Sequence, residues 1–514
     1  MSPTPLLLGI DLGTSACKVA LIDTTGATVA ETEAAYPSSS PQPLWSEQNP
    51  RDWWLAAARS IRGALARVGL NAQRIAGVGL TGQMHGLVVL DADGDVLRPA
   101  ILWNDQRTQP QCAQITRLVG AERLLELTGN IVLPGFTLPK LLWVRDHEPS
   151  IYASIAHVLL PKDFIRYCLT GRFATDVSDA SGTAMFDVAR RRWSDEMLRV
   201  CGAERARLPE ALESTALSGT ITPRSAAETG LSSGTPVFAG AGDQAAAAVG
   251  AGVVNDGDTC VTLGTSGVVF TAMRAHRVAP GGVLHAFCHA VPETWHMMGV
   301  MLSAGGSLRW WRDVLRGGTA MCGDAVPSVD GDAPYAAMIH AAAGVTPGCE
   351  GLLFLPYLTG ERTPHADPLA RGAFVGLTAR HATAHMTRAV LEGVAFGLCD
   401  SLELIRKTGT RPRSVRLSGG GARSAVWRQI MADIFGVDVI VAHGAQGGAF
   451  GAALLAGVGA GCFANVAEAC AAACKTGETT SPGPNREAYR DAYERFRMLY
   501  PTLAPTFRSS AADA

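Results

Sequence analysis

Short apolar runs joined by small polar turns open the chain. Residues 6–11, 16–22 and 27–35 are apolar or alternate apolar with polar positions, and Gly, Thr, Ser and Asp fill the turns between them. The pattern predicts three short strands. Asp11 stands at the end of the first run. Because a buried carboxylate costs free energy unless something pairs with it, Asp11 indicates a polar ligand at this end of the strands.

Helical spacing follows these strands. Asn49 precedes Pro50, which favours a helix start, and apolar residues then recur every three or four positions at Trp54, Ala57, Ile61, Leu65 and Val68. Beyond this helix, residues 74–80 predict a further strand and residues 87–103 a hairpin. Near the end of the chain, residues 486–503 have helical periodicity with a polar face and predict a surface helix.

One pattern occurs twice. Residues 259–270 read TCVTLGTSGVVF and repeat the strand, Gly-Thr-Ser, strand order of residues 6–22. One such hairpin in each half predicts two related domains, as a length of 514 residues also does. Between the two hairpins, residues 236–258 predict a strand, a Gly-rich turn and an Ala-rich helix at the domain junction. Residues 414–436 predict a strand, a third Gly-rich turn and an amphipathic helix.

Composition narrows the class of protein. Hydrophobic residues make up 47% and charged residues 18%, which is typical of a folded globular chain. A net charge of −2 and the lack of a long basic run argue against nucleic acid or anionic membranes as partners. The 12 cysteines are scattered without CxxC spacing, so we expect reduced thiols in a cytoplasmic enzyme and no structural zinc. Cys470 and Cys474 have i,i+4 spacing on an Ala-rich helix and are expected in the core.

One uncharged stretch has the length of a membrane span. Residues 448–467 carry no charge, but they are rich in Ala and Gly, so their transfer into lipid is weakly favourable. We expect a buried helix that ends between Gly457 and Gly461. The beginning of the chain has no basic segment, and Asp11 interrupts its apolar run, so a signal peptide is not expected.

Common nucleotide motifs do not fit this chain. No GxxxxGK[ST] pattern occurs, and the GxGxxG match at residues 77–82 is followed by a strand pattern instead of a helix. The two Gly-Thr-Ser turns offer another way to bind phosphate, because backbone amides and hydroxyls in a tight turn can point at one anion. A single turn is typical of an ordinary hairpin. Two such turns and a third Gly-rich turn favour a polyphosphate bound from both sides, through Gly13, Thr14, Ser15, Gly264, Thr265 and Ser266.

Charged residues near these turns suit the same ligand. Asp11 could hold Mg²⁺ through water, and Lys18 could offset phosphate charge. The GGGARS turn, with Gly420, Gly421 and Ser424, could pack its backbone against adenosine, although a plain strand–helix turn explains it equally well by itself. Asp243, in GAGDQ, is a candidate general base that accepts a hydroxyl proton during phosphoryl transfer. The alternative, that Asp243 caps the Ala-rich helix after it, is equally compatible with the spacing.

Two polar clusters in apolar surroundings suit a sugar. In GQMHG and WNDQR, the groups that could bind hydroxyls are Gln83, His85, Asn104 and Asp105, while Met84 and Trp103 could pack against carbon. A lone histidine in such a setting is more often a satisfied core residue. The His285/His289 and His381/His385 pairs have i,i+4 spacing without HExxH, so we expect no metal site there.

Taken together, the motifs resemble those of the FGGY carbohydrate kinases over residues 6 to about 500, and within that family those of its xylulose-phosphorylating members. Residues 135–147 and 372–393 are similar to the two family signatures. The other motifs that carry the resemblance are PLWSEQNPRDWW, GQMHG, RPAILWNDQR, LLPKDFIRYCLTG, LPYLTGERTPH and SGGGARS.

The resemblance implies an α/β fold of two duplicated, actin-like (ribonuclease-H-like) domains with a deep cleft between them. Residues 1–245 would form the sugar-binding side, residues 246–480 the nucleotide-binding side, and residues 481–514 a terminal helix and tail. It implies that Asp11 and Asp243 face the metal, with Asp243 as the base, and that Met84 and His85 contact the sugar. It assigns phosphate and adenosine contacts to Thr14, Gly264, Thr265, Gly420 and Gly421, and adenine contacts to Gly305 and Arg309.

The expected reaction is transfer of a phosphoryl group from ATP to D-xylulose, with Mg²⁺ and with Asp243 taking the hydroxyl proton. Another ketose or polyol, such as ribulose or glycerol, is an alternative substrate. A non-catalytic ATP-binding sugar sensor is a second alternative, which the presence of both Asp11 and Asp243 disfavours. The expected partners are the sugar and ATP, and a homodimer is left open.

Overall fold

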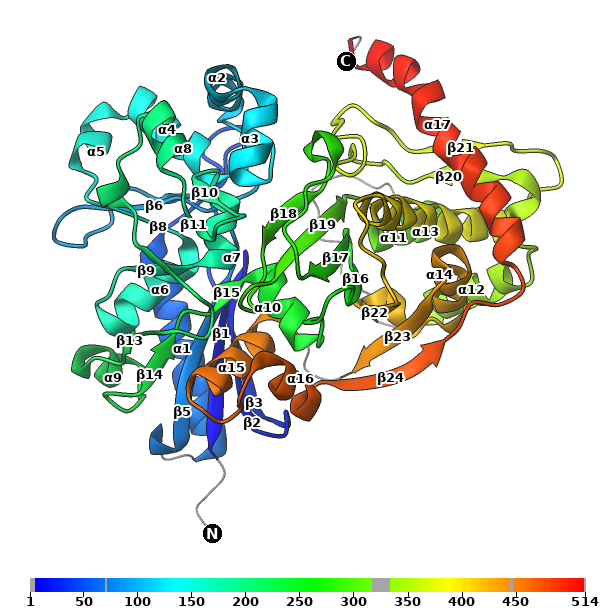
Figure 1. Ribbon diagram of the computed structural model, residues 1–514. Helices are drawn as coiled ribbons and strands as arrows, with labels where there is room; N and C mark the ends of the chain where they lie inside the picture. Colours follow the sequence, from blue (N-terminus) through cyan, green and yellow to red (C-terminus); the bar gives the residue numbers. More distant parts are fainter. Residues whose placement is uncertain (1–4, 70–71, 317–332, 444–446, 513–514) are drawn as a thin grey trace.

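The structure is a computed structural model, and it describes residues 5–69, 72–316, 333–443 and 447–512. Two seven-stranded sheets dominate it (Figure 1). In the first sheet, β1, β2 and β3 are antiparallel, and β5 and β14 then continue the sheet parallel to β1. The strands, in spatial order, are β13 (Leu217–Thr220), β14 (Pro236–Phe238), β5 (Ile75–Gly82), β1 (Leu6–Leu12), β2 (Ala16–Asp23) and β3 (Thr28–Ala35), with β15 (Ala241–Gly242) pairing β5.

The second sheet repeats this arrangement. Strands β16, β17 and β19 are antiparallel, and β22 and β23 run parallel to β16. The repeat in the sequence therefore corresponds to a structural duplication, in which the β1–β2 and β16–β17 hairpins are equivalent. The strands, in spatial order, are β18 (His285–Cys288), β19 (Trp295–Met301), β17 (Gly267–Met273), β16 (Thr259–Leu263), β22 (Ser414–Ser418), β23 (Asp438–His443) and β24 (Lys475–Thr480).

Alternation along the strands gives the first sheet two apolar faces. Leu8 of β1 and Val19 of β2 pack with Trp53 on α1 (Pro50–Val68). The opposite face, which includes Leu7 and Ala20, packs against α10 (Asp243–Gly250) and α15 (Gly448–Gly459). Asn49 caps α1 through its side chain, as its position before Pro50 predicts. Helices α6 (Pro161–Thr170) and α9 (Pro223–Thr229) complete the first face.

Helix α15 comes from the second half of the sequence but lies on the first sheet (Figure 1). Glycines allow the backbone of the helix to lie directly against the backbones of the strands. A Cβ on Gly9 or on Gly79 would lie 1.8 Å from Ala449 O or 1.9 Å from Ala452 O, respectively. On the other side of the helix, a Cβ on Gly451 would lie 1.8 Å from Ala246 O of α10. The domain boundary expected between residues 245 and 246 therefore separates segments that pack together in space.

The second sheet has its own helices. Val261 and Val269 of the β16–β17 hairpin share a core with α13 (Thr383–Lys407), and Trp427 and Tyr489 join the same core. The remaining elements of this half are α11 (Gly305–Leu315), α12 (Ala333–Ala343), α14 (Ala425–Phe435), α17 (Arg486–Ala512) and the β20–β21 pair (Leu353–Leu355, Ala373–Val375).

Residues 87–215, apart from α6, form an inserted region above the first sheet, to which β4 adds a strand from earlier in the chain. It consists of the pairs β4–β7 (Glu47–Gln48, Ala100–Ile101), β6–β8 (Val88–Leu90, His157–Leu159), β9–β12 (Ala174–Asp176, Glu210–Leu212) and β10–β11 (Phe186–Asp187, Arg192–Trp193), with helices α2 (Gln109–Val119), α3 (Ala121–Thr128), α4 (Thr137–His147), α5 (Pro149–Ser154), α7 (Val177–Ala180) and α8 (Asp195–Cys201). The hairpin expected over 87–103 is confirmed in part. The Leu87–Ile101 and Leu90–Val96 bridges and the hydrogen bond from Leu97 N to the Val89 carbonyl join its two arms antiparallel, while its strands form their longer ladders elsewhere, β6 with β8 and β7 with β4.

The uncharged stretch 448–467 is divided between two helices. Helix α15 ends at Gly459, within the predicted range, and α16 (Val466–Ala473) begins after a turn. No helix in the described part of the chain is long and apolar enough to cross a membrane. Cys470 is buried on α16, whereas half-buried Cys474 follows the helix as its C-cap, and both thiols donate to the Val249 carbonyl.

The glycine contact under α15 makes a stability prediction. Gly79→Ala should lower the free energy of unfolding by about 2 kcal/mol or more, because backbone blocks the new methyl group and the helix must shift. Gly420→Ala is the control, since nothing lies within 4 Å of its Cβ position; it should change stability by less than about 0.5 kcal/mol. Urea unfolding without nucleotide measures both. Equal stability of the two variants would contradict the close contact.

Candidate functional site

A cavity of about 270 Å³ lies where the two halves of the chain meet. Its lining includes Thr14 from the first Gly-Thr-Ser turn and Ser266 from the second, so the equivalent turns of the two sheets face one space. Asp243 lies in the same lining. The other lining residues are Met84, His85, Trp103, Leu133, Gly135, Phe136, Gln244, Val268, Met298, Val300 and Arg362.

The first turn, residues 13–15, is held from both sides by hydrogen bonds. The Thr14 carbonyl accepts from Gln48 Nε2 at 2.6 Å, and the Gly13 carbonyl accepts from the Tyr36 hydroxyl. Trp103 Nε1 donates to Thr14 Oγ1 at 3.0 Å, which leaves this hydroxyl its own proton to donate to a ligand. Ser15 is exposed. The turn is therefore rigid before any ligand binds.

The second turn, residues 264–266, packs against the N-terminus of α11. The Gly264 carbonyl accepts from Gly305 N at 2.8 Å, and the Thr265 carbonyl accepts from Ala304 N at 2.9 Å. A Cβ on Gly305 would lie 2.4 Å from Gly264 O, so glycine is required for this contact. Arg309 NH2 donates to Thr265 Oγ1 at 3.2 Å. Sequence-predicted Gly264, Thr265, Gly305 and Arg309 are thus brought together.

The third Gly-rich turn lies beside the second. A Cβ on Gly421 would lie 2.0 Å from Leu263 Cδ2, at the end of β16, whereas Gly420 has open space around its Cβ position. Flat, uncovered backbone at Gly420 suits contact with a planar group. Ser424 has a structural role, because its hydroxyl caps α14 by accepting from Trp427 N at 3.2 Å.

Two carboxylates interact electrostatically here: Asp243 is in the cavity lining, and Asp11 lies outside the lining but close enough for its charge to act on Asp243. Asp11 is paired across β1–β2 with Lys18, and Asp243 is the first residue of α10. Burial raises the pKa of Asp11 to about 6, with Lys18 opposing the shift. Burial, and then the charge of Asp11, raise the pKa of Asp243 to about 7. Lys18 also lies 3.7 Å from Glu33 at the surface.

Asp243 does not cap its helix in the way that the alternative interpretation requires. Gly242 occupies the N-cap position, and Asp243 Oδ1 accepts from the adjacent Gln244 N at 2.7 Å. The carboxylate is partly exposed at the cavity. This placement favours a group that acts on a ligand over one that stabilises the helix.

Asp11 and Asp243 suit a divalent cation. In the described residues, no group of three or more Asp, Glu, His or Cys side chains could hold a metal, so the protein supplies two carboxylates at most. The charge of Asp11 raises the pKa of Asp243, so a cation between them would relieve like-charge repulsion. Mg²⁺ commonly binds through one or two carboxylates together with water and substrate phosphate, and this donor set fits that pattern.

His85 has an unusual backbone and a defined tautomer. Its φ of 70° lies in the left-handed region, and its carbonyl accepts from Lys140 Nζ at 2.9 Å and Thr137 Oγ1 at 3.1 Å. His85 Nδ1 lies 2.7 Å from the Gly182 carbonyl, which can only accept, so Nδ1 carries the proton. Burial lowers the pKa of His85 to about 3. Its Nε2 is therefore a neutral acceptor for a hydroxyl group.

Other predicted sugar contacts have different roles. Gln83 is buried and donates to Gln48 Oε1 at 3.2 Å, which supports the first turn from below. Asn104 is exposed and lies outside the cavity lining. Asp105 is fully buried, pairs with Arg107 at 2.7 Å and accepts from Ser46 N at 2.7 Å. The geometry thus gives Asp105 a structural role and does not support its predicted contact with a sugar.

Arg362 is the cavity residue that sequence reasoning missed. It follows β20 in the second half, lines the cavity and makes no ion pair within the described ranges. Its neighbour Glu361 is buried, accepts from Leu302 N at 3.1 Å and has its pKa raised to about 8 by burial. Phe136, stacked on His85 at 4.9 Å, was also missed. Arg362 lies in the motif LPYLTGERTPH, which is part of the sequence resemblance. The sequence does not show that the fold brings this residue into the cavity.

Comparison with known proteins gives one consistent result. The pattern of the FGGY family of carbohydrate kinases matches residues 6–250 with its N-terminal domain and 259–460 with its C-terminal domain. The xylulose kinase of Escherichia coli K12 is 42% identical over 501 residues, 97% of this chain and 99% of the relative. The gluconokinase of Bacillus subtilis 168 is 30% identical over 452 residues, 87% and 86% of the two chains.

A solved structure agrees with these relatives. The crystal structure of xylulose kinase from Rhodospirillum rubrum is 32% identical, with a TM-score of 0.90 over 98% of this chain and 100% of that one. The two-domain, actin-like architecture implied by the sequence resemblance is therefore confirmed.

The low pKa of His85 predicts a pH-dependent contribution to stability. The unfolded chain binds a proton at this residue near pH 6.5 and the folded chain only near pH 3, so wild type loses stability as pH falls below 6.5. The stability advantage of wild type over His85→Gln should shrink by about 1.4 kcal/mol between pH 7.5 and 5.5. Urea unfolding at both pH values tests this, with exposed His340→Gln as control. A constant advantage would contradict a neutral His85.

Proposed function

The chain belongs to the FGGY family of carbohydrate kinases, and from that premise we propose that it phosphorylates D-xylulose to D-xylulose 5-phosphate. Members of this family are phosphotransferases with ATP and a sugar as substrates. The observation that carries the proposal is the shared cavity, where one Gly-Thr-Ser turn from each sheet and Asp243 meet. Identity of 42% over nearly the whole chain to a xylulose kinase supports the choice of sugar.

Asp243 acts as the general base in this proposal. A sugar hydroxyl oxygen attacks the terminal phosphorus of ATP, the bond to the bridging oxygen of ADP breaks, and the hydroxyl proton passes to the Asp243 carboxylate. A raised pKa near 7 makes this carboxylate a better proton acceptor than an exposed aspartate, and it is about half ionised at neutral pH and increasingly ionised above it. The burial that raises the pKa also keeps bulk water away from the reacting hydroxyl.

The two turns stabilise charge on the transferred group. Thr14 and Ser266 reach the cavity from opposite sheets, and Thr265 is oriented by Arg309. Asp11 and Asp243 would hold Mg²⁺, which would neutralise phosphate charge when bound. Donors that are fixed before the reaction need no reorganisation as charge develops, which is the main source of such catalysis. The rigid hydrogen bonding of both turns supports this role.

Sugar recognition combines three kinds of contact. His85 Nε2 accepts from a hydroxyl, Arg362 donates to hydroxyl or carbonyl oxygen, and Met84 and Trp103 cover carbon atoms. The two polar groups come from different halves of the chain, so a bound sugar would bridge them. A site that hydrogen-bonds each hydroxyl discriminates against sugars that leave its buried groups unpaired.

A sugar acid is a second candidate substrate. The guanidinium of Arg362 makes no ion pair among the described residues and could bind a carboxylate directly. The similarity to a gluconokinase, at 30% identity, gives this candidate independent support. Ribulose and glycerol remain alternatives from the sequence. We further propose a cytoplasmic enzyme, and the homodimer stays open.

Substrate selection tests the proposal directly. A coupled assay for ADP release should give D-xylulose the highest kcat/KM among D-xylulose, D-ribulose, L-ribulose, glycerol and D-gluconate, because each unpaired buried group costs about 1–3 kcal/mol. ADP release is also measured without sugar, because a non-catalytic ATP-binding switch would show no increase when sugar is added. If D-gluconate is best by tenfold or more, the sugar-acid candidate replaces xylulose. If no sugar stimulates ADP release, the chain is not a kinase for these substrates.

The role of Asp243 has its own test. Asp243→Asn keeps the shape of the side chain but cannot accept the proton, so kcat should fall by about 10²–10⁴. Affinity for ATP, measured by fluorescence titration in the absence of Mg²⁺, should change little because the adenosine and phosphate contacts lie on other residues. Gln244→Asn, next along the same cavity wall, is the control. A variant that keeps half of the wild-type turnover would remove Asp243 from the mechanism.

A further inference from the structure

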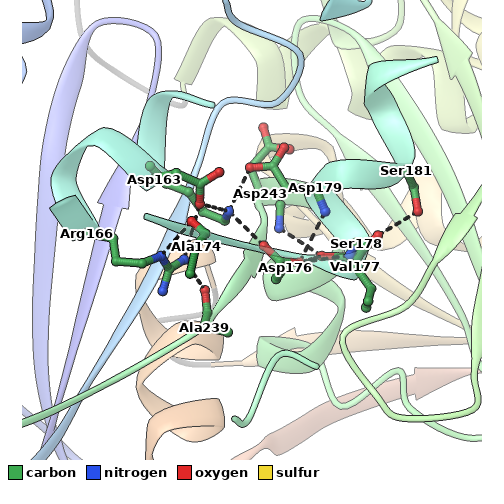
Figure 2. Close-up of polar contacts among 12 residues, drawn as sticks. Asp163, Arg166, Ala174, Asp176, Val177, Ser178, Asp179, Ser181, Ala239 and Asp243 are labelled. Atoms are coloured by element: carbon green, nitrogen blue, oxygen red, sulfur yellow. Dashed lines mark hydrogen bonds and ion pairs between the residues drawn. The ribbon is translucent and has the colours of Figure 1, made fainter. Parts of the chain in front are cut away.

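A fully buried cluster of charges lies near Asp243 (Figure 2). Lys162 Nζ, on α6, lies 2.7 Å from Asp163 Oδ1, 2.7 Å from Asp176 Oδ2 and 2.9 Å from Asp179 Oδ2. Arg166, one turn along α6, lies 3.2 Å from Asp163. None of these five side chains is exposed. The chemistry described above uses none of them directly, so the cluster needs another explanation.

The cluster is close to electrically neutral. Three carboxylates face two cations, and burial together with the neighbouring carboxylates raises the pKa of Asp179 well above its usual value, with Lys162 opposing. A proton on Asp179 leaves two negative charges facing two positive ones. Such a network is rigid, because removing any one partner would leave a buried charge unpaired. A rigid network is suited to holding a neighbouring loop.

One arm of the network reaches the residue before Asp243. Asp176 Oδ1 accepts from the Ser178 hydroxyl at 2.5 Å and also from Ser178 N at 2.8 Å. The Ser178 oxygen in turn accepts from Gly242 N at 3.0 Å. A chain of contacts therefore runs from Lys162 through Asp176 and Ser178 to the amide of Gly242, the residue before Asp243.

A second arm reaches the beginning of the same loop. Arg166 donates to the Phe238 carbonyl at 3.1 Å and to the Ala239 carbonyl at 2.6 Å. Between the two arms, glycines fit the loop against its neighbours. Gly240 has a φ of 70°, and a Cβ there would lie 1.8 Å from Leu80 O. A Cβ on Gly242 would lie 2.9 Å from Met84 Sδ. Residues 238–242 are thus fixed at both ends and along their length.

We propose that Ser178, oriented by Asp176 and Lys162, is a positioning residue that holds Gly242 and thereby sets the location of the Asp243 carboxylate. This inference rests on the proposed role of Asp243 as general base. Ser178 touches neither the cavity nor a substrate, and it acts only through the Gly242 peptide. Loss of its hydroxyl frees that peptide to rotate and displaces the carboxylate by a fraction of an ångström, which is enough to slow proton transfer.

A matched pair of serines tests the proposal. Ser178→Ala should lower kcat by about tenfold or more, with the KM values for sugar and ATP within about twofold of wild type, because binding contacts lie elsewhere. Ser181→Ala is the control. Ser181 is equally buried, follows on the same segment, and its hydroxyl accepts from Cys288 N at 3.0 Å and donates to the Val177 carbonyl at 2.7 Å. It should lose stability to a similar degree but keep kcat within about twofold. Thermal unfolding of both variants measures whether their losses of stability are similar.

A double-mutant cycle separates this inference from the function on which it rests. If Ser178 acts through Asp243, Ser178→Ala should cause no further loss of kcat in the Asp243→Asn background. A loss of the same size in both backgrounds overturns the positioning role, as does a kcat for Ser178→Ala equal to that for Ser181→Ala. An Asp243→Asn enzyme with at least half of wild-type turnover instead overturns the general-base assignment itself.

Discussion

The close contact between α15 and the first sheet determines how the two halves of the molecule are joined. Helix and strand backbones touch because Gly9, Gly79 and Gly451 have no side chains, and α10 lies against the other side of the same helix. This contact brings Gly448, at the N-terminus of α15, next to Asp11, where a Cβ would lie 2.7 Å from Oδ2. The helix that joins the two halves therefore also packs against Asp11, whose charge acts on Asp243 in the cavity lining.

Buried charge is the second constraint, and it is arranged in two layers. In the layer that faces the ligand, Asp11 and Asp243 have raised pKa values because nothing in the protein fully compensates their burial. In the layer behind, Lys162 and Arg166 compensate three carboxylates almost completely. Such a division is expected of an active site. The reactive groups must stay available to interact with the substrate, whereas the buried groups that hold them in place must have their charges and hydrogen bonds paired within the protein.

Some of the residues that the sequence proposed for the site line the cavity, and others do not. Both Gly-Thr-Ser turns, Asp243, Met84 and His85 reach one cavity, because each lies at the end of a strand whose period is evident locally. Asp105 lies in an equally suggestive cluster, yet it pairs with Arg107, a local contact that spacing cannot distinguish from ligand binding. The hairpin over 87–103 was predicted, but the pairing of its strands with β4 and β8 was not, because those strands are distant in sequence. Arg362 was missed for the same reason, since only the fold brings it into the cavity with His85.

By itself, the sequence determined the periodicity of the strands and helices, the duplication, the phosphate-type turns and the family, because these depend on local spacing and on motifs a few residues long. The tertiary structure decided which side chains face the cavity and which are neutralised behind it. It placed α15 on the sheet of the other half, gave His85 its tautomer through the Gly182 carbonyl, and linked Ser178 to Gly242. These outcomes depend on contacts between residues far apart in the chain, whose energies are set by burial and by partners that no local pattern contains.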